Sequence, residues 1–209
     1  MKTFQEIIVE PGHTVNHMGH SGEHLRFRLK AGAVLHYFLA VLDVSKTHVI
    51  VDLEGEASRV DSQVIFFGDQ EQEQDIRVEH VHRGRETHSI MHSRGAVKDK
   101  AWGRFYGLVR MEKGATGADG HLNEHNLLLS PNARIEAVPA LEIEHDDVKA
   151  SHSATLEKVD AERLFYLCSR GLDESAAVQV LVEGFFTSAL ESVPLEQRED
   201  LYSAILKKL

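Results

Sequence analysis

The chain has 209 residues, 42% of them hydrophobic and 27% charged, which is ordinary for a soluble globular protein. Its 33 acidic residues outnumber 23 basic ones, and the formal charge of −10 argues against a general binder of nucleic acid or anionic membranes. No run of 18 or more apolar residues occurs, so no membrane-spanning helix is expected. The single cysteine, Cys168, excludes an internal disulfide framework, and a reducing, cytoplasmic location is the simplest expectation.

Between about residues 25 and 140 the sequence favours β-strands over helices. Short apolar runs, such as residues 37–42 and 64–67, are separated by glycine, aspartate, asparagine and serine at close intervals. Many short runs with frequent turn residues are typical of an all-β body. Residues 76–82 and 133–138 alternate apolar and polar side chains, which predicts strands with one buried face. A sandwich, a cupin-like barrel and a stacked β-helix all fit this pattern.

The pattern changes near residue 156, after which helices are predicted. Asp160 can cap a helix over residues 161–168 that ends at Gly171, and Asp173 can cap a second helix. The second helix carries apolar residues at helical spacing, which form one broad face. A third helix is expected over residues 195–209. We therefore expect a β core over residues 1–155, weakest in signal over 1–75, followed by a helical domain over 156–209.

Motifs for nucleotide and acyl-transfer chemistry are missing from the sequence. It contains no G-x-x-x-x-G-K-[ST], G-x-G-x-x-G or G-x-S-x-G segment, so neither ATPase nor serine-hydrolase activity is expected of this chain. Histidine is abundant, with 14 residues. His80 and His82 would share one face of a strand, and Glu86 follows shortly afterwards. Because such a set can begin a mononuclear metal site, a cupin-like metalloprotein or metalloenzyme using His80, His82, Glu86 and also His88 is one hypothesis.

Four ordered segments in the second half of the chain carry a resemblance to a known family. They are residues 120–130 (GHLNEHNLLLS), 138–143 (VPALEI), 146–155 (DDVKASHSAT) and 164–171 (LFYLCSRG). Together they resemble the SufB/SufD family of iron–sulfur cluster assembly proteins, and the details are closer to SufD than to SufB. The resemblance begins near residue 75, and the preceding residues match only in general character.

The resemblance implies a right-handed parallel β-helix core followed by a small α-helical C-terminal domain. It also implies a non-catalytic scaffold that works with a SufC-type ABC ATPase. The scaffold is expected to form a dimer, either with a SufB-type protein or with a second copy of itself. A chain without a phosphate-binding loop is consistent with this role, because the ATPase activity would reside in the partner.

The resemblance also implies site residues. The histidine of the family's "SH.AT" segment falls on His152, which is expected at the dimer interface as a residue of cluster assembly and a candidate metal ligand. The SufB position that supplies a cluster-ligating cysteine falls on or near Glu124, and His125 is its neighbour. Since thiolate is the preferred ligand of iron–sulfur clusters, this chain is expected to hold no cluster alone. A transient cluster shared with a partner is the expectation.

ATPase docking is expected on the helical segment after residue 164, where the family match is dense. The candidate residues are Leu164, Phe165, Tyr166 and Arg170. The alternative for these side chains is packing against the end of the β core.

Overall fold

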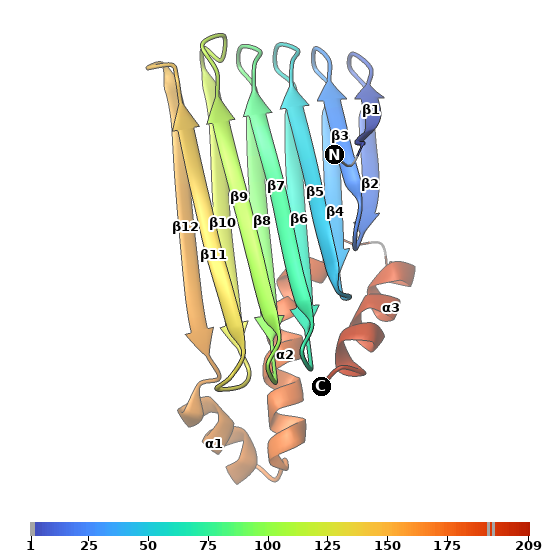
Figure 1. Ribbon diagram of the computed structural model, residues 1–209, viewed down its shortest axis with the longest axis vertical. Helices are drawn as coiled ribbons and strands as arrows, with labels where there is room; N and C mark the ends of the chain where they lie inside the picture. The colour runs from blue at the N-terminus through green and yellow to red at the C-terminus, as the bar shows by residue number, and fades with distance from the viewer. Residues whose placement is uncertain (1–2, 192, 194) are drawn as a thin grey trace.

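A computed structural model describes residues 3–191, 193 and 195–209. The described residues form twelve strands followed by three helices. All strand pairings are parallel, and each strand pairs with the strand two places along the chain, so the chain coils as a parallel β-helix (Figure 1). This confirms the predicted fold class, a β-helix core followed by helices.

The strands fall into two six-stranded sheets that face each other across the interior. The odd sheet has the order β1-β3-β5-β7-β9-β11, and the even sheet has the order β12-β10-β8-β6-β4-β2. The strands are β1 (Gln5–Val9), β2 (Thr14–His20), β3 (His24–Leu29), β4 (Val34–Val41), β5 (Ser45–Leu53), β6 (Arg59–Gly68), β7 (Glu73–His82), β8 (His88–Val97), β9 (Trp102–Met111), β10 (Ala118–Leu128), β11 (Arg134–Ile143) and β12 (Val148–Lys158).

Alternating side chains build the core of the β-helix. In β5, for example, Val49, Val51 and Leu53 are inward and fully buried, whereas the outward positions between them carry Ile50 and Asp52. Successive coils stack these inward side chains in register, which buries one continuous apolar core.

Tight turns between coils depend on close backbone contacts. A Cβ on Gly55 would lie 2.0 Å from the backbone nitrogen of Ala31, so only glycine fits where these two turns stack.

The three helices follow the last strand, with the first two caps as predicted. They are α1 (Ala161–Ser169), α2 (Glu174–Leu190) and α3 (Leu195–Leu206). The Asp160 carboxylate accepts hydrogen bonds from the backbone N–H groups of Glu162 and Arg163, and Asp173 caps α2 through Ala176. Gly171 takes a positive φ of 103° just after α1.

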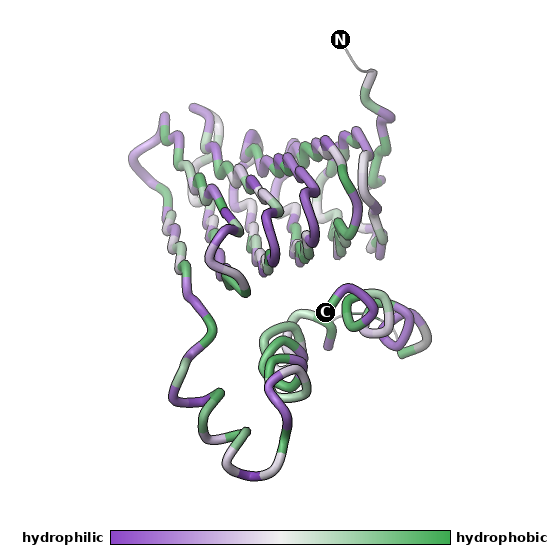
Figure 2. Tube along the Cα trace, turned by 60° about the horizontal axis from the view of Figure 1, so that its bottom comes forward, coloured by the Kyte–Doolittle hydropathy of each residue, from purple (hydrophilic) through white to green (hydrophobic). Residues whose placement is uncertain are grey.

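Helices α2 and α3 lie on the outer side of the even sheet (Figure 2), where they pack against residues near the carboxyl ends of its strands. Outward side chains of the sheet, among them Phe38, Ile65 and Phe67, form a second apolar cluster with Val182 and Phe186. This cluster explains the broad apolar face predicted for α2. In contrast, no described helix covers the outer face of the odd sheet (Figure 2).

The three described helices are each too short or too polar to cross a lipid bilayer. The last strand extends to Lys158, and the first helix begins at Ala161.

Candidate functional site

The last coil of the β-helix carries the residues singled out in the sequence. In β10, the inward positions are taken by Leu122, Glu124 and Asn126, and the outward positions by His121, Asn123 and His125. This division follows from the period of two along a strand. Glu124 and His125 therefore point to opposite faces of the sheet, although they are adjacent in sequence.

Glu124 lies wholly inside the β-helix, with 0% of its surface exposed. Its Oε1 accepts a 2.9 Å hydrogen bond from Nδ2 of Asn126. Burial raises the pKa of the Glu124 carboxyl to about 7, and the hydrogen bond from Asn126 opposes this rise only in part. The carboxyl is therefore close to its midpoint between acid and carboxylate at neutral pH.

The polar surroundings of Glu124 extend to the next coil. Ser93 of β8 is the register neighbour of Glu124 and is also fully buried. Among the described residues, Oε2 of Glu124, Oδ1 of Asn126 and Oγ of Ser93 have no hydrogen-bond partner. Polar side chains thus line the interior in a region where a β-helix core is usually apolar.

His152 lies on the same inward face as Glu124, on the neighbouring strand. In the pairing of β10 with β12, Leu122 is opposite His152 and Glu124 is opposite Ala154, so Glu124 and His152 are diagonal neighbours. His152 is exposed, because β12 is the edge strand of the even sheet. The structure therefore brings two of the three predicted site residues to one face and leaves the third on the other.

His125 faces outward. Its Nδ1 lies 3.1 Å from Oγ1 of Thr155 on β12. Partial burial, with Arg94 as a nearby positive charge, lowers the pKa of the His125 imidazole. These contacts separate His125 from the interior that Glu124 occupies.

His80 and His82 share one face of β7, as predicted, but that face is the interior. Both are fully buried. His80 Nε2 lies 2.9 Å from Oγ of Ser62, and the two nitrogens of His82 each lie 2.8 Å from a hydroxyl, of Thr87 and of Ser89. Burial lowers the pKa of His80 to about 3 and that of His82 to about 4, so both rings are neutral core residues.

The cupin-like hypothesis is not supported. Glu86 lies in the turn after β7, with a φ of 56°, and its side chain rests against Gly117. His88 lies on β8, and its side chain is on the outer face of the even sheet, away from the interior. Within the described residues, no group of three histidine, cysteine, aspartate or glutamate side chains is arranged to hold a metal ion. The fold is also a β-helix, which removes the barrel on which a cupin site depends.

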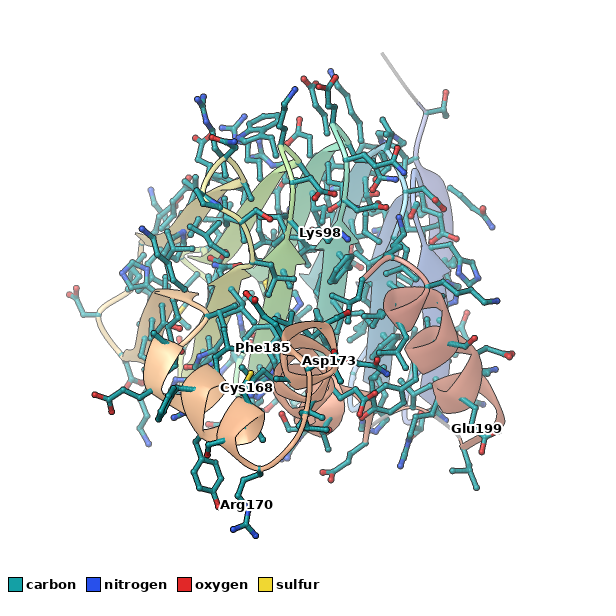
Figure 3. All side chains as sticks on the ribbon, turned by 90° about the horizontal axis from the view of Figure 1, so that it is seen from below. Lys98, Cys168, Arg170, Asp173, Phe185 and Glu199 are labelled. Carbon is teal, nitrogen blue, oxygen red and sulfur yellow. The ribbon has the colours of Figure 1, made fainter. Side chains whose placement is uncertain are left out.

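The predicted docking residues lie on an exposed helix. Phe165 is 75% exposed and Tyr166 is 61% exposed, whereas Leu164 is half-buried. No residue of α1 is buried. Arg170, at the carboxyl end of α1, extends away from the β-helix (Figure 3). Packing of Phe165 and Tyr166 against the end of the β core, the alternative considered from the sequence, is therefore not observed.

The sequence reasoning missed Asn126, the hydrogen-bond partner of Glu124. The signal was present, because Asn126 lies two residues after Glu124 and must share its face on a strand. It missed Ser93 for a different reason, since the pairing of β8 with β10 has no local sequence signature.

Comparison with known proteins identifies relatives of this chain. The family model for the SufBD core domain of SUF-system iron–sulfur cluster assembly matches residues 12–185. SufD of Bacillus subtilis is 31% identical over 159 residues, which cover 76% of this chain and 36% of that protein. SufD of Escherichia coli is 32% identical over 171 residues, covering 80% of this chain and 40% of that protein. A SufBD family protein of Mycobacterium tuberculosis is 30% identical over 178 residues, which cover 84% of this chain and 21% of that protein.

The chain thus spans two fifths or less of the length of these three relatives. The family match nevertheless extends over most of the chain, and it includes eleven complete β-helix strands, from β2 to β12. The similarity to two SufD proteins agrees with the segments recognised in the sequence. This protein belongs to the SufBD family of iron–sulfur cluster assembly proteins and contains the core domain of that family.

Proposed function

We propose that this protein is a non-catalytic scaffold subunit of a SUF-type iron–sulfur cluster assembly complex and acts with a SufC-type ABC ATPase. The observation that carries the proposal is the placement of Glu124 and His152 on the inward face of the last coil, in a chain of the SufBD family. An interior carboxyl and an exposed imidazole lie there on adjacent strands, at the open edge of the fold.

The chemistry of these two groups suits a nascent cluster held only in part by this chain. Imidazole nitrogen and carboxylate oxygen both bind iron, whereas sulfur-rich clusters prefer thiolates. The cysteine of this chain, Cys168, belongs to α1 and not to the last coil. We therefore assign the thiolates to a partner and the nitrogen ligand to His152, with the cluster as transient cargo.

The partner at this end is a SufB-type protein or a second copy of the chain. Strands β11 and β12 are the last strands of their sheets, so one side of each leaves backbone N–H and C=O groups available for pairing. Pairing of strands across such an edge would extend both sheets and bring His152 against the partner.

The ATPase is proposed to dock on α1. Phe165 and Tyr166 expose aromatic surface there, and aromatic side chains are common anchors of protein interfaces. Arg170, at the end of the same helix, adds a charged contact outside the apolar patch.

Co-expression with the SufC-type ATPase of the same organism tests the complex. The chain is captured with and without a SufB-type protein, and the mass of the product is measured by light scattering. A defined complex that contains the ATPase is expected, and its loss is expected in Phe165→Ser/Tyr166→Ser. Val44→Ser is the matched control, since Val44 is 65% exposed in the turn after β4. Absence of the ATPase from both preparations would overturn the proposal.

The role of His152 is tested separately. His152→Ala is expected to keep the fold and to reduce cluster formation in the reconstituted complex. His36→Ala is the control, because His36 is also exposed but lies on β4, far along the even sheet. Wild-type cluster formation in His152→Ala would contradict the assigned role.

A further inference from the structure

The part of β12 that carries His152 has little support from the core. Val148 and Ala150, at the start of the strand, pack against the apolar core. From Ser151 to Lys158 every residue is exposed, and no described strand pairs with the far side of β12. Apart from its backbone pairing with β10, this segment needs another source of order if His152 is to keep a fixed position.

That source is a row of hydrogen bonds on the outer face of the even sheet. Three consecutive outward side chains of β10 each contact the side-chain hydroxyl of a serine or threonine of β12. His121 Nδ1 lies 2.6 Å from Oγ of Ser151, Ser153 Oγ donates to Oδ1 of Asn123 over 2.9 Å, and His125 Nδ1 lies 3.1 Å from Oγ1 of Thr155. We call these three contacts the outer ladder.

The outer ladder brackets His152. Ser151 and Ser153, the residues on either side of it, are both tied to β10, while His152 points to the opposite face. In a strand, fixing the two outward neighbours fixes the direction of the inward side chain between them.

The first rung of the ladder also lies beside a carboxylate. Nε2 of His121 lies 2.7 Å from Oδ1 of Asp119, within ion-pair distance, while Nδ1 of the same ring contacts the Ser151 hydroxyl.

We propose that His121, Asn123 and His125 are positioning residues, which hold β12 through Ser151, Ser153 and Thr155 so that His152 keeps its place beside Glu124. This inference rests on the proposed function of His152. It also gives a role to His121 and His125, two histidines that the assembly site does not use directly.

The test removes the hydroxyls of the ladder from the full chain. The deletion variant is Ser151→Ala/Ser153→Ala/Thr155→Val. Its matched control, Ser151→Thr/Ser153→Thr/Thr155→Ser, changes the same positions and keeps every hydroxyl. Amide hydrogen exchange is followed along the chain, and the imidazole resonances of His152 are followed by NMR.

In the deletion variant, the backbone amides of residues 151–156 should exchange about tenfold faster than in the wild type. The reason is that three side-chain hydrogen bonds, each with a modest net contribution to stability, are lost from an exposed strand. Exchange in β6 and β8 should not change. The His152 resonances should shift and broaden, and the control variant should restore both signals. Unchanged exchange and unchanged His152 resonances in the deletion variant would overturn the inference.

Cluster formation separates this inference from the proposed function. If His152→Ala abolishes assembly and the deletion variant also reduces it, both stand. If His152→Ala abolishes assembly but the deletion variant assembles clusters at the wild-type rate, positioning by the ladder is refuted. If His152→Ala has no effect, the role of His152 fails, while exchange and NMR still decide whether the ladder orders β12.

Discussion

The side-chain amide of Asn126 donates a 2.9 Å hydrogen bond to Oε1 of Glu124 inside the last coil of the β-helix. The two residues are consecutive on the inward face of β10. Burial nevertheless dominates and raises the pKa of the Glu124 carboxyl to about 7, above its usual value of 4.5. One hydrogen bond does not replace the solvation that a carboxylate loses in this interior.

Glu124→Gln should stabilise the protein at high pH and leave its stability almost unchanged at low pH. A pKa raised on folding favours the folded state fully below the unfolded pKa, and this contribution is lost as the pH rises from 4.5 through about 7. Removing the carboxyl should therefore add about 3 kcal/mol to the free energy of unfolding at pH 8. Urea unfolding at pH 4.5 and pH 8 measures this difference. An effect of equal size at both pH values would contradict the assignment.

His80 and His82 should make the protein sensitive to acid. Burial lowers the pKa of His80 to about 3 and that of His82 to about 4, from a usual value of 6.5. Below pH 6.5 the unfolded chain takes up protons that the folded chain excludes, so stability falls as the pH drops toward the folded pKa values. The two rings together should lower the free energy of unfolding by up to about 2.7 kcal/mol per pH unit between pH 6 and pH 4.

The measurement is best made in the Glu124→Gln background, because Glu124 has the opposite pH dependence in part of this range. His80→Gln should reduce the slope to about half, since one of the two excluded protons is removed. The same slope in the variant and its parent would show that His80 does not titrate as proposed.

Gly95→Ala should destabilise the core. A Cβ on Gly95 would lie 1.9 Å from Cζ of Phe66, whose ring stacks on Phe105 at a centroid distance of 6.4 Å. Expelling this ring should cost about 2 to 3 kcal/mol in unfolding free energy. In a double-mutant cycle, Phe66→Leu should recover part of the loss, because the smaller side chain vacates the space.

Gly184→Ala is the control for that substitution. Gly184 is inside α2, and apart from the adjacent residues and the backbone of the helix itself no atom lies within 4 Å of its added Cβ. Alanine is the better helix former, so a stabilisation of up to about 1 kcal/mol is expected. A destabilising Gly184→Ala, or a neutral Gly95→Ala, would disagree with the packing described.

Two phenylalanines of the helical segment should respond differently to truncation. Phe186 is 1% exposed and packs against Phe67 of the even sheet at a ring distance of 6.4 Å, whereas Phe165 is 75% exposed. Phe186→Ala should lower the free energy of unfolding by about 3 to 5 kcal/mol. Phe165→Ala should change it by less than about 0.5 kcal/mol. Thermal and urea unfolding measure both, and a large effect of Phe165→Ala would mean that α1 is packed more tightly than described.

Local sequence signals predicted much of the architecture. The helix caps at Asp160 and Asp173 act on backbone N–H groups two or three residues away, so the sequence contains both partners of each contact. The alternation of His80 and His82 likewise predicted that they share a face, because side chains on a strand alternate with a period of two.

The tertiary structure decided which face that was. An H-x-H pair has the same local pattern on an inner or an outer face. Only the coiling of the chain, which sets β7 opposite β6 and β8, placed both rings in the interior, His80 beside Ser62 and His82 beside Ser89. The tertiary structure likewise decided that Glu124 faces the interior and that its neighbour His125 faces outward. The outer ladder depends on residues about 30 positions apart, which the coiling of the chain brings side by side. The sequence by itself therefore determined the strands, caps and family, whereas burial and contacts between coils, which depend on long-range pairing, were decided only by the fold.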